Sequence, residues 1–297
     1  MAARLAWGAV VAVFVLMTLG NVVSATGSGL ACPDWPLCHG SLIPPLRPDV
    51  LIEYSHRLAA LAATVLILAV AGLTLRRSRA PGTRRLAGLL PALLVVQILL
   101  GGITVLLRLP DLISTAHLIN ALLILAGLIV LAGALQEPAG GPRAAGVDRL
   151  RRLARVGLIV LLVQLALGGY VRHSGAGLAC PDFPLCSGDV LPGQWLAGVH
   201  WVHRWLGVLL LGLFVHLAVA GRTLGARLVA ALAVLQVVLG IAAVLLQLPP
   251  AVRAAHAAVG YALWAVLVWV SVEAGSWRVL AAAAAAPGPA GEVAHAS

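Results

Sequence analysis

Charged side chains are scarce in this chain of 297 residues: Asp, Glu, Lys and Arg make up 10% of it, whereas hydrophobic residues make up 61%. Soluble globular domains carry about 25% charged residues, so this balance excludes that class. The ten acidic residues form no cluster, which excludes the Asp-rich magnesium–diphosphate site of a prenyltransferase. In place of charge the chain has long apolar runs.

Eight apolar segments recur along the chain and have the length needed to cross the roughly 30 Å hydrocarbon core of a bilayer. They are 7–25, 52–75, 86–107, 112–135, 153–171, 200–220, 226–247 and 252–272. The fifth is short, because only sixteen uncharged residues separate Arg155 from Arg172, and these two arginines are expected to extend to the membrane interface. Since backbone groups in lipid must bond one another, the sequence predicts an all-α, polytopic membrane protein with eight transmembrane helices.

The net charge of +10 does not indicate a nucleic-acid partner, because the arginines are placed in loops between the apolar segments. Three loops hold most of them, at 76–85, 143–155 and 222–227. The positive-inside rule places these loops in the cytoplasm. We therefore expect a multi-pass protein of the cell membrane, with both termini cytoplasmic, the loops at 26–51 and 172–199 outside, and a basic face against anionic lipid.

One loop sequence occurs twice: residues 27–40 read GSGLACPDWPLCHG and residues 175–188 read GAGLACPDFPLCSG. A second pair, QILLGGITVLLRLPDLISTAH at 97–117 and QVVLGIAAVLLQLPPAVRAAH at 236–256, also aligns position by position. Such internal similarity indicates a duplicated module. We expect two pseudo-symmetric four-helix bundles, at 1–138 and 151–280, joined by a cytoplasmic linker at 139–150 and followed by a disordered tail at 281–297.

All four cysteines lie in the two repeated loops, as the pairs Cys32 and Cys38, and Cys180 and Cys186. On the oxidising side of a membrane this spacing favours the disulfides Cys32–Cys38 and Cys180–Cys186, with the intervening Pro and Asp residues turning the chain. A structural disulfide is the preferred interpretation, ahead of a redox-active pair and of a metal site. His39 has no counterpart in the second loop, where Ser187 stands, which weakens the metal hypothesis.

Four histidines recur at equivalent depths near the start of alternate helices, close to the outer membrane surface: His56, His117, His203 and His256. Ionisable residues inside a membrane bundle are costly and usually functional. Two imidazoles from facing helices of a four-helix bundle commonly hold a heme iron. Axial ligation by His56 with His117, and by His203 with His256, is therefore favoured over internal hydrogen bonding.

The two halves differ beside the first histidine of each pair. Glu53 precedes His56 by three residues, and His200 stands at the matching position of the second half. A carboxylate at the edge of an apolar heme pocket can accept a proton or stabilise a developing cation. The first half is thus predicted to be catalytic and the second to be a supporting redox site. Arg57 and Arg204 either pair with heme propionates or extend to the membrane interface.

Three further residues have less clear roles. His216 lies deep in its helix without a counterpart and is expected to be packed or lipid-facing. His173 is expected to be a solvated loop residue, with contact to a heme propionate as the alternative. Arg172 matches Ser24 of the first half, so any propionate contact of Arg172 would need a different cation in the first site.

Taken together, these features resemble the bacterial heme A synthase family over the whole chain except the tail. The features are GLACPDWPLC at 29–38, Glu53-x-x-His56, His117, CPDFPLC at 180–186, His203 and His256. The resemblance implies an oxidoreductase that converts the C8 methyl group of heme O to a formyl group by successive hydroxylations. The product, heme A, serves terminal oxidases.

The resemblance also implies a role for each half. Heme O would lie between His56 and His117 with Glu53 as the catalytic carboxylate, and a heme B cofactor between His203 and His256. The first cysteine pair, Cys32 and Cys38, would take part in the activity, whereas the second would be structural. Expected partners are heme O, membrane lipid, an electron acceptor of unknown identity and the farnesyltransferase that makes heme O.

Two other functions fit part of the pattern. A di-heme b-type cytochrome that transfers electrons would share the four histidines, but it has no need of Glu53 or of the cysteine loops. A heme-handling membrane protein would use the same pockets as carriers. Pigment extraction from the wild type and from a Glu53→Ala variant distinguishes these functions, because only a synthase yields heme A.

Overall fold

The computed structural model describes residues 1–136 and 147–275, which form eight α-helices and no strand. The helices are α1 (Ala2–Ala25), α2 (Pro48–Arg77), α3 (Pro81–Leu106), α4 (Asp111–Gln136), α5 (Val147–His173), α6 (Trp195–Gly221), α7 (Leu224–Leu245) and α8 (Pro250–Glu273). A short 3-10 helix, η1 (Ala176–Leu178), follows α5. Each of the eight α-helices is long and apolar enough to cross a membrane. The prediction of an all-α, polytopic membrane protein is confirmed.

The helices begin earlier than their apolar segments do, because polar first turns belong to them. Helices α2, α3 and α8 each start with a proline, which suits a first turn since its missing N–H would have no partner there. Helix α5 starts at Val147 and includes arginines that precede the predicted segment 153–171. The paired histidines consequently lie about two turns into their helices.

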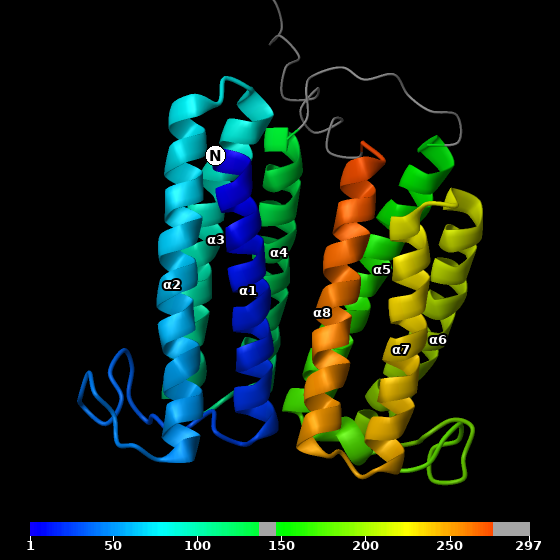
Figure 1. Cartoon of the computed structure of the whole chain (residues 1–297). Helices are drawn as coiled ribbons and strands as arrows, with labels where there is room; N and C mark the ends of the chain where they lie inside the picture. Colours follow the sequence, from blue (N-terminus) through cyan, green and yellow to red (C-terminus); the bar gives the residue numbers. More distant parts are fainter. Residues whose placement is uncertain (137–146, 276–297) are drawn as a thin grey trace, which may run out of the picture.

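The helices pack as two neighbouring sets (Figure 1). Helices α1–α4 contact one another in a closed ring, and α5–α8 do the same, while α1 and α4 meet α8 and α4 meets α5. Both cysteine loops lie at one end of the molecule, and the first residues of α1 lie at the other (Figure 1). The predicted linker falls largely outside the described residues, as the tail at 281–297 does entirely, and the duplication itself stays a prediction.

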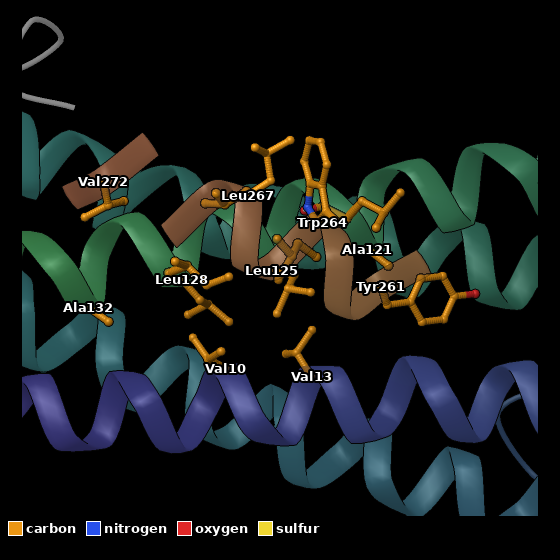
Figure 2. Close-up of a cluster of buried hydrophobic side chains, with 14 of the residues drawn as sticks. Val10, Val13, Ala121, Leu125, Leu128, Ala132, Tyr261, Trp264, Leu267 and Val272 are labelled. Carbon is orange, nitrogen blue, oxygen red and sulfur yellow. The ribbon is translucent and has the colours of Figure 1, made fainter. Parts of the chain in front are cut away.

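The largest apolar core lies where α1, α4 and α8 meet (Figure 2). Leu125 and Leu128 of α4 and Leu267 of α8 are fully buried there. The indole N–H of Trp264 donates a hydrogen bond of 2.9 Å to the backbone oxygen of Leu122. The same core continues into both sets of helices, so the two sets are packed against each other through shared side chains. Many large apolar side chains elsewhere are exposed, as expected for surfaces that face lipid.

Candidate functional site

Each of the four paired histidines lies against a glycine of the preceding helix. A Cβ atom built on that glycine would approach the imidazole Cε1 to between 2.7 and 3.2 Å. The pairs are Gly20 with His56 at 2.7 Å, Gly101 with His117 at 3.2 Å, Gly168 with His203 at 2.8 Å, and Gly240 with His256 at 3.1 Å. A side chain at any of these positions would displace the ring, so the glycines set where the imidazoles lie. Sequence reasoning missed this role, although the repeated glycines at 101 and 240 were visible in the alignment.

The same four histidines carry a buried polar atom without a partner. Within the part of the chain that the structure describes, Nδ1 of His56, His117, His203 and His256 makes no hydrogen bond. A buried nitrogen left in this state costs free energy. Nε2 of His117 lies 3.2 Å from the side-chain nitrogen of Gln97, and Nε2 of His256 lies 3.2 Å from the side-chain nitrogen of Gln236. Imidazoles with unsatisfied nitrogens fit a site that binds a metal-containing ligand.

The second set of helices encloses a cavity of about 390 Å³ around one histidine pair. His203 and His256 line it, together with small residues that include Gly168, Gly207 and Gly240. Arg172, Arg204 and Arg253 also line it and add positive charge to walls that are mostly apolar. An apolar cavity with a few convergent polar groups has the character of a cofactor site.

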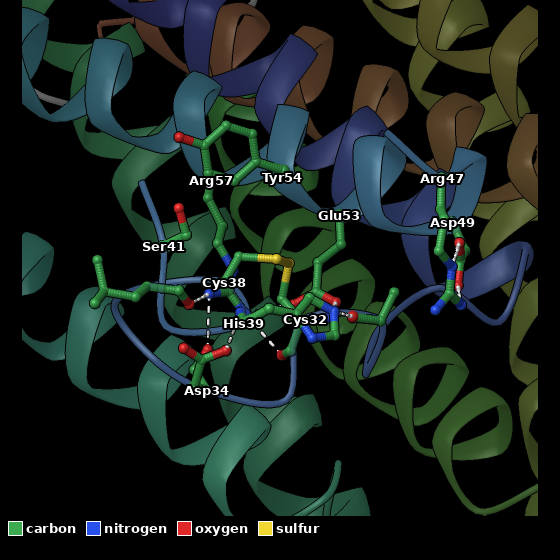
Figure 3. The surroundings of a disulfide bond; sticks show 12 residues. Cys32, Asp34, Cys38, His39, Ser41, Arg47, Asp49, Glu53, Tyr54 and Arg57 are labelled. Atoms are coloured by element: carbon green, nitrogen blue, oxygen red, sulfur yellow. Dashed lines mark hydrogen bonds and ion pairs between the residues drawn. A yellow bond between two sulfur atoms is a disulfide. The ribbon is translucent and has the colours of Figure 1, made fainter. Parts of the chain in front are cut away.

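Glu53, on α2 in the first set of helices, is buried and paired with Arg57 beside the first cysteine loop (Figure 3). One carboxylate oxygen accepts a 2.7 Å hydrogen bond from the backbone N–H of Cys32, and the other accepts one of 2.6 Å from Arg57. Arg57 itself is only 15% exposed at its side chain. Both bonds fix the position of the carboxylate group. The structure therefore places this carboxylate one helical turn before His56, in contact with the first cysteine loop.

Arg57 and Arg204 hold the two cysteine loops in the same way. Arg57 donates to the backbone oxygens of Cys32, Asp34 and Leu37 at 3.1, 2.8 and 2.5 Å. In the second half, Arg204 donates to the backbone oxygens of Cys180, Asp182 and Leu185. The remaining contact distinguishes the halves: Arg57 binds the Glu53 carboxylate, whereas Arg204 lies 3.2 Å from the imidazole Nε2 of His200. These contacts are to protein groups, and pairing with propionates stays a prediction.

The cysteines of each loop form the predicted disulfides, Cys32–Cys38 and Cys180–Cys186. Asp34 accepts hydrogen bonds from the backbone N–H groups of Gly40 and His39 at 2.7 and 2.6 Å. These bonds, that of Gly40 foremost, hold the pKa of Asp34 below its usual value. Asp182 of the second loop has a lowered pKa for the same reason, with Gly188 and Ser187 as its donors.

Arg172 connects the second cavity to the first set of helices. Its guanidinium donates to the side-chain oxygen and, at 2.8 Å, to the backbone oxygen of Asn21 on α1, and at 3.0 Å to Ser24. Asn21 in turn donates to the backbone oxygen of Ala254 on α8 at 2.8 Å. Arg172 and Ser24, which occupy matching places in the two halves, are thus in direct contact. Sequence reasoning aligned them but did not predict that they meet.

The other histidines have ordinary surroundings. His216 lies 3.2 Å from a terminal nitrogen of Arg149 near the end of α5 and α6 opposite the cysteine loops. His39 contacts the backbone oxygen of Ala31 at 2.9 Å. The expectation of a solvated loop residue at position 173 is wrong, because His173 is the half-buried last residue of α5. Across residues 1–136 and 147–275, no group of three or more His, Cys, Asp or Glu side chains is arranged to hold a metal ion alone.

Comparisons with known proteins agree with this arrangement. The family model COX15-CtaA, described as cytochrome oxidase assembly protein, matches residues 3–51 and 48–268. The chain is 32% identical over 216 residues to a heme A synthase of Bacillus licheniformis, covering 70% of this chain and 72% of that protein. It is 32% identical over 213 residues to a heme A synthase of Bacillus pumilus, with 68% and 69% covered. For a heme A synthase of Exiguobacterium sibiricum the values are 33% over 209 residues, with 68% and 69% covered.

Proposed function

This chain belongs to the COX15-CtaA family of cytochrome oxidase assembly proteins, and from that membership we propose how its residues perform heme A synthesis. The chain is an oxidoreductase that converts heme O to heme A. Both the family and the activity inferred from the sequence are confirmed. The division of labour between the halves is the part that we propose, and one observation carries it: the buried Glu53–Arg57 pair stands in the first half alone, where the second half has His200 and Arg204.

We propose that the first set of helices takes heme O as substrate, with His56 and His117 on either side of its iron. The two rings lie against Gly20 and Gly101, so neighbouring backbone fixes how far each ring reaches into the bundle. Oxidation of the C8 methyl group withdraws electrons and builds positive charge on that carbon. The Glu53 carboxylate, already held in place by two hydrogen bonds, would stabilise that charge or accept the proton that leaves.

The residues of the second half fit a heme B cofactor between His203 and His256. The fit rests on two observations: both Nδ1 atoms are buried without a partner, and both histidines line a mostly apolar cavity together with several glycines. Arg172 and Arg253 line the same cavity and supply the positive charge that heme propionates need. When bound, heme B would supply one-electron chemistry.

A di-heme electron-transfer cytochrome would need the histidine pairs but not the contacts around Glu53. A buried carboxylate without partners is costly, and in this chain an arginine and a backbone N–H both bind the carboxylate beside the first histidine pair. A heme that only transfers electrons does not explain why the first half has this carboxylate and the second half does not. A reaction carried out on the heme bound in the first half does explain it.

The decisive experiment compares Glu53→Gln with His200→Gln in cells that also produce heme O. These variants make the same amide at matching places in the two halves. We expect wild type and His200→Gln to yield heme A in extracted pigment, and Glu53→Gln to retain heme O or a hydroxylated form with heme A lowered at least about a hundredfold. Unmodified heme B alone in all three proteins would contradict the synthase function, and equal heme A in all three would contradict the role of Glu53.

Two features of the setting complete the proposal. The cysteine loops face the outside of the cell membrane and both termini face the cytoplasm, as the arginine-rich loops indicate. The farnesyltransferase that makes heme O is a proposed partner, because so apolar a product is best passed on within the membrane. Its failure to co-purify with this chain in mild detergent would count against a stable complex.

A further inference from the structure

The first cysteine loop places a tryptophan beside the proposed substrate site. Trp35 lies over Gly102 of α3, where an added Cβ would come within 3.1 to 3.3 Å of three atoms of the indole. Gly102 directly follows Gly101, the glycine that faces His117. The indole and the proposed iron ligand thus rest against consecutive residues of one helix.

In the second half, the side chain at the position matching Trp35 is smaller, and the side chain at the position matching Gly102 is larger. Phe183 stands where the first loop has Trp35, and Ile241 stands where α3 has Gly102. Both Phe183 and Ile241 line the cavity that holds His203 and His256. The first half therefore combines a tryptophan in the loop with a glycine on the helix, and the second combines a phenylalanine in the loop with an isoleucine on the helix.

The residues that surround these two aromatic–helix contacts are otherwise alike in the two halves. Histidines rest on glycines in both halves, and Arg57 and Arg204 hold the two loops by the same three backbone oxygens. Trp35 and Phe183 are also exposed to the same extent, 39% and 38%. Two sites with one frame must still bind different hemes, because heme O carries an isoprenoid tail that heme B lacks. The two sites differ in shape at Trp35 and Gly102 of the first half and at Phe183 and Ile241 of the second.

We propose that Trp35 and Gly102 form the specificity-determining wall of the first site, and that they admit heme O where Phe183 and Ile241 restrict the second site to heme B. This inference rests on the proposed function. A branched side chain at position 102 would occupy the surface on which the indole now lies, and a shorter aromatic at position 35 would withdraw the flat apolar face available to the substrate.

The test transplants the wall of the second site into the first, as Trp35→Phe with Gly102→Ile. Gly102→Ile alone forces the indole to move and is expected to disturb the loop. The double variant instead introduces the pair of side chains that stands at the matching positions of the second half. Intact disulfides and one retained heme B per chain report that the protein has folded. The proteins are purified from cells making both heme O and heme B, and hemes are extracted and counted per chain.

We expect the double variant to lose heme O and heme A at least about tenfold and to approach two heme B per chain. Heme O and heme A at wild-type levels would overturn the proposal, and so would a first site that holds neither heme, since the wall would then be structural. The reciprocal change, Phe183→Trp with Ile241→Gly, should lower heme B retention and admit heme O to the second site; heme B retention at the wild-type level would count against the proposal. Failure of the wild type to make heme A would instead overturn the proposed function, so the two failures are distinguishable.

Discussion

At the scale of single residues, the clearest difference between the halves is the partner of one arginine. Arg57 bridges the Glu53 carboxylate and three loop carbonyls, a task that uses the several N–H donors of a planar guanidinium. Arg204 makes the same loop contacts but meets an imidazole. Arg57 is thus a positioning residue for the carboxylate, and Arg204 is its natural control.

We predict that Arg57→Lys lowers heme A formation at least about tenfold while heme binding persists, because an ammonium group cannot replace four directed bonds, each worth about 1 to 3 kcal/mol. Arg204→Lys removes the same loop contacts in the other half and should leave the turnover of bound heme O within about threefold of wild type. The measurement is single-turnover conversion of bound heme O, followed by extraction, together with its pH profile. Equal losses in both variants would show that loop support alone explains the effect.

The sequence revealed the chemistry-bearing residues but not what holds them. His56, His117, His203 and His256 stand out because histidines are rare and the repeat doubles them. Gly20 and Gly168, by contrast, look like ordinary small residues of membrane helices. Only the packing of α1 on α2 and of α5 on α6 shows that each faces an imidazole. Contacts between helices depend on rotation and crossing angle, which the pattern of a single helix leaves open.

At the scale of helices, the glycines opposite the histidines are sites where a methyl group should remove a heme. Gly168→Ala would place Cβ 2.8 Å from the ring of His203, and Gly20→Ala would place it 2.7 Å from that of His56. Overpacking of this kind costs about 1 to 3 kcal/mol, so we expect heme occupancy to fall about tenfold in the affected half only. Gly8→Ala on α1, where nothing lies within 4 Å of the added atom, should bind heme as wild type does. Heme content per chain is the measurement.

The cysteine loops should respond to acid through their aspartates. The pKa of Asp34 is below its ordinary value of 3.8 when folded, so the carboxylate stabilises the loop at any pH above that value, and the stabilisation is lost as pH falls through the lower folded pKa. We predict that a phosphine reduces Cys32–Cys38 at a constant relative rate between pH 7 and about pH 5 and faster below about pH 4. Rates are normalised to Asp34→Asn, whose first loop should be reduced faster throughout and show no such acid step. Acceleration near pH 6 would point to a histidine instead.

At the scale of the whole molecule, the sequence predicted eight helices and their order but not how the two sets join. The apolar periodicity of α4 and α8 does not say that they face each other, yet the core runs between them. The polar link from Arg172 through Asn21 to the backbone of α8 was equally hidden, because its members lie far apart in the chain. One consequence is that both proposed heme sites lie in a single packed body, with Arg172 reaching from the second cavity to the helix that carries Gly20.

The orientation of this body in the membrane is a prediction from the placement of the arginines, and it can be measured with one added thiol. All four native cysteines are paired in disulfides, so a fifth would be the single reactive one. Ala80 and Gln194 suit the purpose, because each precedes a helix at its N-cap and makes no side-chain capping bond. The arginines around position 80 favour the cytoplasm. A membrane-impermeant maleimide should therefore label Gln194→Cys while the cell membrane is unbroken, once any outer layers have been removed. It should label Ala80→Cys only after the cell membrane is broken. The reverse pattern would place both cysteine loops, and with them Glu53 and the paired histidines, on the cytoplasmic side, where the disulfides would be exposed to reduction.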